Sequence, residues 1–126
     1  MKDKRILIVD DEPDILRLTL LRLKKSGFEV ITALNGSDAI VVAGREKPDL
    51  ILLDMVLPKM NGSQVCRYLK NHNELSHIPV ILFTASSNTM TAIRAKKIGA
   101  DDFIVKPFDP DVLIAKIDDA LMVRRE

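Results

Sequence analysis

The sequence has little of several features, and each shortage excludes a class of protein. Cys66 is the only cysteine among 126 residues, so no disulfide can form within the chain. The net charge is +1 without a long basic run, which argues against direct nucleic-acid binding. No apolar run is long enough to span a membrane. The first residues resemble no signal peptide, so we expect a reducing, cytoplasmic setting.

The apolar residues, 47% of the chain, are gathered into short runs. Most of these runs are continuous rather than alternating, which is typical of strands buried on both faces of a parallel sheet. A chain of this length suits one domain, residues 1–126, with a sizeable core. The predicted strands are residues 6–9, 28–32, 50–53, 80–83 and 103–105.

Stretches with helical spacing of apolar residues lie between and after these runs. Pro13 suits the first turn of the first helix, and Gly27 suits the position just beyond its end. Alternating strands and helices predict an α/β fold with right-handed crossovers. We expect a doubly wound, five-stranded parallel sheet of flavodoxin-like order 2-1-3-4-5. The predicted helices are residues 14–26, 35–46, 62–71, 88–98 and 109–123.

Polar residues follow four of the five predicted strands. Asp10 and Asp11 follow the first, Asp54 the third, Thr84 the fourth and Lys106 the fifth. The carboxyl ends of parallel strands share one edge of the sheet, where this fold binds its ligands. Three carboxylates there would repel one another unless a cation joined them, and hard oxygen ligands suit Mg²⁺. Each residue alone has an ordinary structural reading, such as a helix N-cap for Asp10 or Asp11, but their joint placement favours a site.

Four segments carry a family resemblance: "ILIVDDEP", "LILLDMVLPKMNG", "VILFTAS" and "GADDFIVKPF". Along essentially its whole length the chain resembles the receiver domain of response regulators in two-component signalling. The resemblance implies that Asp54 accepts a phosphoryl group in a Mg²⁺-dependent reaction. It implies that Asp11 and the backbone carbonyl of Val56 bind Mg²⁺ directly, and that Asp10 does so through water. Two further positions, Thr84 and Lys106, would contact the phosphoryl group, with a cis peptide between Lys106 and Pro107.

The resemblance also implies the partners and the output. The donor would be a phosphohistidine on a sensor histidine kinase or a histidine phosphotransfer protein, and the target an unknown effector domain or protein. Movement of Thr84 and Phe103 would carry the signal to the surface of the fourth helix, fifth strand and fifth helix. Such a domain is not an enzyme beyond its own phosphorylation and dephosphorylation. Val112 and Asp118 interrupt the ionic set of relatives that dimerise, so we expect a monomer or weak dimer.

Three alternatives compete with this interpretation. An aspartyl phosphatase of the haloacid-dehalogenase type needs a second aspartate two residues after the nucleophile, where this chain has Val56. A nucleotide- or flavin-binding module needs a glycine-rich phosphate loop after a strand, whereas the first loop here is acidic. A pseudo-receiver, which serves only as a protein-binding scaffold, lacks part of the phosphorylation site, whereas this sequence has every residue that the site requires.

Overall fold

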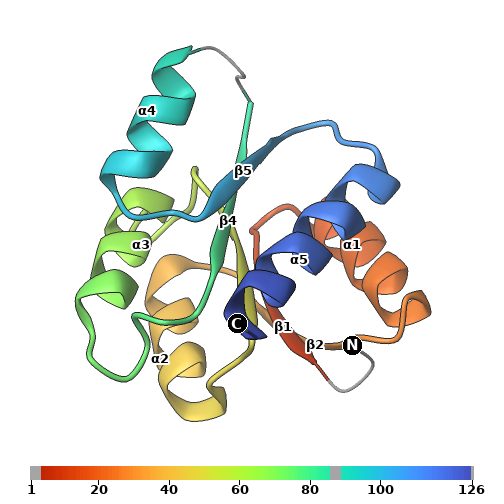
Figure 1. The fold of residues 1–126 in the computed structure, drawn as a ribbon, viewed down its shortest axis with the longest axis horizontal. Coiled ribbons are helices and arrows are strands. Elements are labelled where there is room, and N and C mark those ends of the chain that lie inside the picture. Colours follow the sequence, from red (N-terminus) through yellow and green to blue (C-terminus); the bar gives the residue numbers. More distant parts are fainter. Residues whose placement is uncertain (1–3, 86–88, 126) are drawn as a thin grey trace.

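The computed structural model describes residues 4–85 and 89–125, which form one parallel sheet flanked by helices (Figure 1). The strand order is β2-β1-β3-β4-β5, so the predicted fold class and topology are confirmed. Along the chain the elements are β1 (Arg5–Val9), α1 (Pro13–Lys25), β2 (Glu29–Ala33), α2 (Gly36–Glu46), β3 (Leu50–Asp54), α3 (Gly62–Asn71), β4 (Val80–Thr84), α4 (Thr89–Lys97), β5 (Asp102–Val105) and α5 (Pro110–Arg125).

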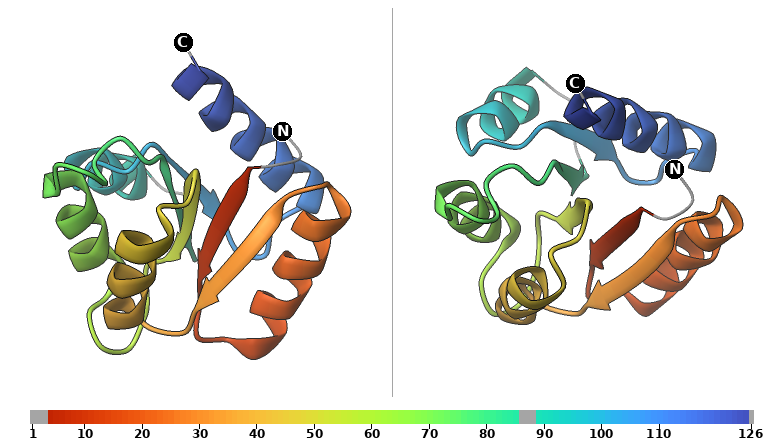
Figure 2. Two further views of the ribbon diagram at one scale, coloured as in Figure 1. Left: turned by 90° about the horizontal axis from the view of Figure 1, so that it is seen from below. Right: turned by 60° about the horizontal axis from the view of Figure 1, so that its bottom comes forward.

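Helices cover both faces of the sheet (Figure 2). Side chains alternate along a strand, so Ile6 and Ile8 of β1 join the core under α1 and α5. Leu7 and Val9 point the other way and join the core under α2, α3 and α4. Burial on both faces explains why the strand sequences are continuously apolar.

The helix ends follow local sequence signals. Pro13 is the first residue of α1, and Gly27, just beyond its end, has a φ of 95°, which suits glycine. The Asn61 side chain accepts a hydrogen bond from the Gln64 N–H while the Gln64 side chain caps Asn61 in return, forming a capping box at α3. The fourth helix was predicted from residue 88, which lies outside the described residues, and α4 is described from Thr89.

Strand register brings the predicted polar residues to one edge. Val9 pairs with Leu53, so Asp10 and Asp54 follow neighbouring paired positions. Asp54 itself pairs with Phe83, and Thr84 pairs with Val105, the residue before Lys106. Among the described residues, no helix is both long enough and apolar enough to cross a membrane.

Candidate functional site

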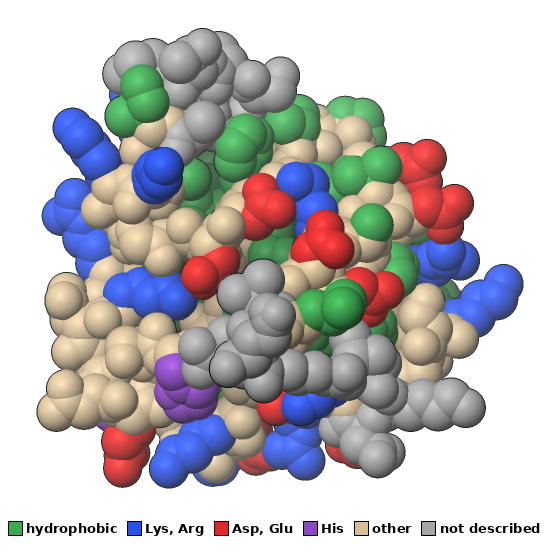
Figure 3. Space-filling model, in the orientation of Figure 1, with side chains coloured by type: hydrophobic (Ala, Val, Ile, Leu, Met, Phe, Trp, Pro, Cys, Tyr) green, Lys and Arg blue, Asp and Glu red, His purple; other side chains and the backbone are tan. Residues whose placement is uncertain are grey.

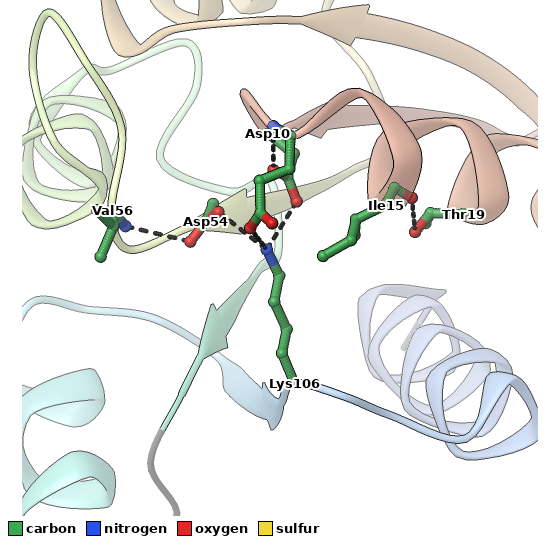
Figure 4. Close-up of polar contacts among 7 residues, drawn as sticks. Asp10, Ile15, Thr19, Asp54, Val56 and Lys106 are labelled. Atoms are coloured by element: carbon green, nitrogen blue, oxygen red, sulfur yellow. Dashed lines mark hydrogen bonds and ion pairs between the residues drawn. The ribbon is translucent and has the colours of Figure 1, made fainter.

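Lys106 is the centre of a charged cluster at the carboxyl edge of the sheet (Figure 4). Its Nζ lies 2.8 Å from Asp10 Oδ2, 2.9 Å from Asp54 Oδ2 and 3.4 Å from Glu12 Oε1. Asp10 follows β1 directly and Asp54 is the last residue of β3, so the two aspartates are 44 residues apart in the chain, and both are buried. The Lys106–Pro107 peptide is cis, as the family resemblance implied. The topology therefore assembles one site from three strand ends.

Backbone N–H groups hold the other oxygen of each buried aspartate. The Glu12 N–H donates to Asp10 Oδ1 at 2.9 Å, and the Val56 N–H donates to Asp54 Oδ1 at 3.1 Å. Each carboxylate is thus held between the lysine and a backbone donor two residues further along the chain. This arrangement fixes the orientation of both carboxylates without help from a solvent-exposed side chain.

Burial and ion pairing act on the site in opposite directions. Burial raises the pKa of Asp54, and the hydrogen bonds from Lys106 and Val56 offset part of that rise. Burial would lower the pKa of Lys106, but its hydrogen bonds to Asp10 and Asp54 raise that pKa above its ordinary value. The ammonium also lies 5.4 Å from the centroid of the Phe83 ring, which favours a cation. Lys106 therefore stays protonated at neutral pH.

The carboxylates form a set of oxygen donors that suits a hard divalent cation. One oxygen from each of Asp10, Glu12 and Asp54 lies within 4.8 Å of the others. Three carboxylates face a single lysine, so the cluster has excess negative charge that a cation such as Mg²⁺ would compensate. The residues present therefore fit the implied metal.

Only some of the predicted metal ligands lie together in the structure. Asp10 and Asp54 converge, whereas Asp11 is exposed and lies outside the group of three. The sequence analysis did not predict Glu12 as a member of the site. The available signal was its place as the third acid of "DDEP", because this loop follows the first strand at the same edge of the sheet. Val56 contributes its N–H to Asp54, while its side chain is 79% exposed.

Thr84 and Phe103 lie beside each other on the α4 side of the sheet. Both line a small cavity of about 60 Å³, together with Met55, Leu82, Arg94 and Ala95. Thr84 is half-buried at the end of β4, and its carbonyl accepts a hydrogen bond from the Lys106 N–H at 2.8 Å. Phe103 is half-buried in β5, one strand away. The proximity of the two residues is the arrangement that a coupled movement requires.

The fold and site together define a flavodoxin-like α/β domain with a buried aspartate–lysine cluster. The chain belongs to the response regulator receiver domain family, whose model matches residues 6–118. It is 40% identical over 115 residues to the alkaline phosphatase synthesis transcriptional regulatory protein PhoP of Bacillus subtilis, covering 91% of this chain and 47% of that protein. It is 38% identical over 114 residues to the DNA-binding response regulator MtrA of Mycolicibacterium smegmatis, covering 90% of this chain and 49% of that protein.

The solved structures agree with this membership. A CheY-like response regulator receiver domain protein from Methanospirillum hungatei superposes with a TM-score of 0.89 at 30% identity, covering 98% of this chain and 97% of that chain. The chain spans about half the length of the curated relatives it matches. This domain is a receiver of two-component response regulators, a phosphorylation-activated switch, and the aspartyl phosphatase alternative is not favoured.

Proposed function

We propose that Asp54 accepts the phosphoryl group from a phosphohistidine on a sensor histidine kinase or a histidine phosphotransfer protein. The observation that best supports this proposal is the convergence of Asp54, Asp10 and Lys106 at one end of the sheet, where Lys106 Nζ lies 2.9 Å from Asp54 Oδ2. An oxygen of Asp54 would attack phosphorus as the P–N bond breaks, and the bonding electrons would go to the imidazole. Lys106 would neutralise the phosphoryl oxygens as charge develops on them.

Asp54 and further oxygen donors at this edge of the sheet would hold Mg²⁺ in this proposal. The resemblance assigns direct binding to Asp11 and the backbone carbonyl of Val56, and binding through water to Asp10. In the structure, Glu12 rather than Asp11 is the acid grouped with Asp10 and Asp54. The cation would supply positive charge that masks repulsion between the nucleophile and the incoming phosphoryl group. Turnover would be limited to the domain's own phosphorylation and dephosphorylation.

Incubation with acetyl phosphate and Mg²⁺ tests the phosphoacceptor. We expect a mass gain of about 80 Da that is absent from Asp54→Asn. Asp49→Asn is a matched control, because Asp49 lies at the opposite end of the sheet beside the first residue of β1. A label that persists in Asp54→Asn would contradict the proposal.

The output would begin at the cavity shared by Thr84 and Phe103. Phosphoryl oxygens on Asp54 would draw the Thr84 hydroxyl inward, making room for an inward Phe103 rotamer. Phenylalanine has no hydroxyl to favour an outward, solvated rotamer, so we expect partial inward occupancy before phosphorylation. The readout surface would be α4, β5 and α5.

Structures with and without beryllofluoride on Asp54 test this switch. We expect the inward Phe103 population to rise with beryllofluoride, and Phe103→Tyr to begin from a more outward population because its hydroxyl can be solvated. If Thr84 and Phe103 stay in place while partner binding changes, the coupling runs through residues 55–62 instead.

The surface around α4, β5 and α5 supports a monomer or weak dimer before phosphorylation. Figure 3 shows acidic and basic side chains interspersed on this side of the molecule. Asp101 accepts hydrogen bonds from Lys70 and from the Val80 N–H, and Asp102 pairs with Lys116 at 3.1 Å. These acids are therefore already engaged within the chain. Sedimentation at micromolar concentration should give a monomer mass, and a tight unphosphorylated dimer through this face would be contrary to the proposal.

The effector and the compartment complete the proposal. Two relatives are named a transcriptional regulatory protein and a DNA-binding response regulator, which supports an effector that acts on transcription, joined to the receiver or recruited by it. The receiver itself would make no direct nucleic-acid contact. A single, buried cysteine is compatible with the cytoplasmic setting that we propose.

A further inference from the structure

The oxygens of the two buried aspartates are all engaged before any cation binds. Asp10 and Asp54 each have one oxygen bonded to a backbone N–H and the other bonded to Lys106. A backbone donor can leave only if its loop moves, whereas a lysine side chain can change rotamer. A cation that binds these carboxylates therefore competes first with Lys106.

Glu12 is the remaining carboxylate within reach of the lysine. Its Oε1 lies 3.4 Å from Lys106 Nζ, and its side chain is 58% exposed, so it is free to adjust. Glu12 occupies the N-cap position of α1, yet its side chain makes no capping hydrogen bond to the helix. Its backbone is fixed nevertheless, because its N–H donates to Asp10. The carboxylate is thus tethered at the site without being committed to the helix.

We propose that Glu12 is a positioning residue that retains Lys106 at the site when a cation binds Asp10 and Asp54. The lysine moves from the buried aspartates toward Glu12 rather than leaving for solvent, and so it remains within reach of Asp54. This inference rests on the proposed Mg²⁺ site and adds a role for one residue in it.

A double-mutant cycle on Mg²⁺ affinity is the first test. Without Glu12 the lysine has only Asp10 and Asp54 as partners, so Glu12→Gln should weaken Mg²⁺ binding about fivefold by calorimetry, measured without phosphoryl donor. Asp14→Asn is the matched control, because Asp14 is an exposed acid in the first turn of the same helix; it should weaken binding less than about twofold. In a Lys106→Met background the effect of Glu12→Gln should fall to that of the control. An equal loss in both backgrounds would mean that Glu12 acts on the cation directly, which would overturn the proposal.

Nuclear magnetic resonance of the Lys106 side chain gives a second test that needs no lysine variant. The two Hε protons should have different shifts in the metal-free wild type and in Glu12→Gln, because Asp10 and Asp54 hold the ammonium in both. With saturating Mg²⁺ the difference should persist in the wild type and collapse in Glu12→Gln. A difference that persists in the Mg²⁺-saturated variant would show that Glu12 does not retain the lysine.

Labelling by acetyl phosphate separates this inference from the proposed function. If Asp54 is labelled in the wild type but the two tests above fail, only the role of Glu12 is wrong. If the wild type neither binds Mg²⁺ nor becomes labelled, the proposed function fails, and the role of Glu12 fails with it.

Discussion

Gly62→Ala is expected to lower the free energy of unfolding by about 1–3 kcal/mol and to slow phosphorylation of Asp54. Gly62 begins α3, and a Cβ atom there would lie 2.4 Å from the Asp54 carbonyl oxygen and 2.7 Å from Met55 Cα. Its N–H donates to the Met55 carbonyl at 3.1 Å, so the N-terminal end of α3 packs directly against the backbone that follows β3. A methyl group must push the helix and the phosphoacceptor apart.

Gly44→Ala is the control for the effect of adding a methyl group to a helical glycine. Gly44 is exposed in α2, and a Cβ there meets nothing within 4 Å. Alanine should therefore stabilise the protein by about 0.5–1 kcal/mol, because it favours helix more than glycine does. Urea denaturation and the rate of labelling by acetyl phosphate measure both variants. If Gly62→Ala matches Gly44→Ala, the close approach at Asp54 does not constrain the site.

Asp54→Asn should raise the free energy of unfolding in metal-free buffer at neutral pH by on the order of 1 kcal/mol. Burial raises the pKa of Asp54, so its ionised form is less favourable in the folded protein than in the unfolded chain. The variant removes this charge, and Lys106 keeps Asp10 and Glu12 as partners. Asp101→Asn is a control for which the opposite result is expected. It should lower the free energy of unfolding, because the Asp101 carboxylate accepts hydrogen bonds from Lys70 and from the Val80 N–H.

The advantage of Asp54→Asn should depend on pH and on Mg²⁺. A raised folded pKa means that the folded wild type loses stability as pH rises from the ordinary value of 3.8 through the raised value. The gap between variant and wild type should therefore open across that window, stay constant above it and close below it. Mg²⁺ should narrow the gap at neutral pH, because it binds the wild-type carboxylates more tightly. A variant less stable than wild type in metal-free buffer at pH 7 would contradict this account.

Much of the fold could be predicted because each local signal agreed with the topology. Runs such as "ILIV" and "LILL" are continuous because both faces of β1 and β3 are buried. The alternation of strands and helices predicted the strand order 2-1-3-4-5. This order, with the position of each residue at the end of its strand, placed Asp10, Asp54 and Lys106 at one edge of the sheet. The convergence of these three residues could therefore be predicted before any distance was known.

Other features depend on backbone geometry that the sequence does not specify. The dihedral angles of the loop after β1 decide which acids of "DDEP" face Lys106, and in the structure Glu12 does so while Asp11 is exposed. Asp101 bonds the Val80 N–H and Lys70, and these contacts depend on where the chain before β5 lies rather than on any sequence pattern. The close approach of Gly62 to the Asp54 backbone likewise requires knowing where α3 packs.

Mapping the phosphoryl linkage tests the central claim most directly. The protein is phosphorylated with acetyl phosphate and Mg²⁺, the acyl phosphate is reduced with borohydride, and the peptides are sequenced by mass spectrometry. The account predicts that the reduced residue, homoserine, appears at position 54 and at no other aspartate. Homoserine at Asp10 or Asp11, or its absence from position 54 in protein that carries the phosphoryl mass, would contradict it.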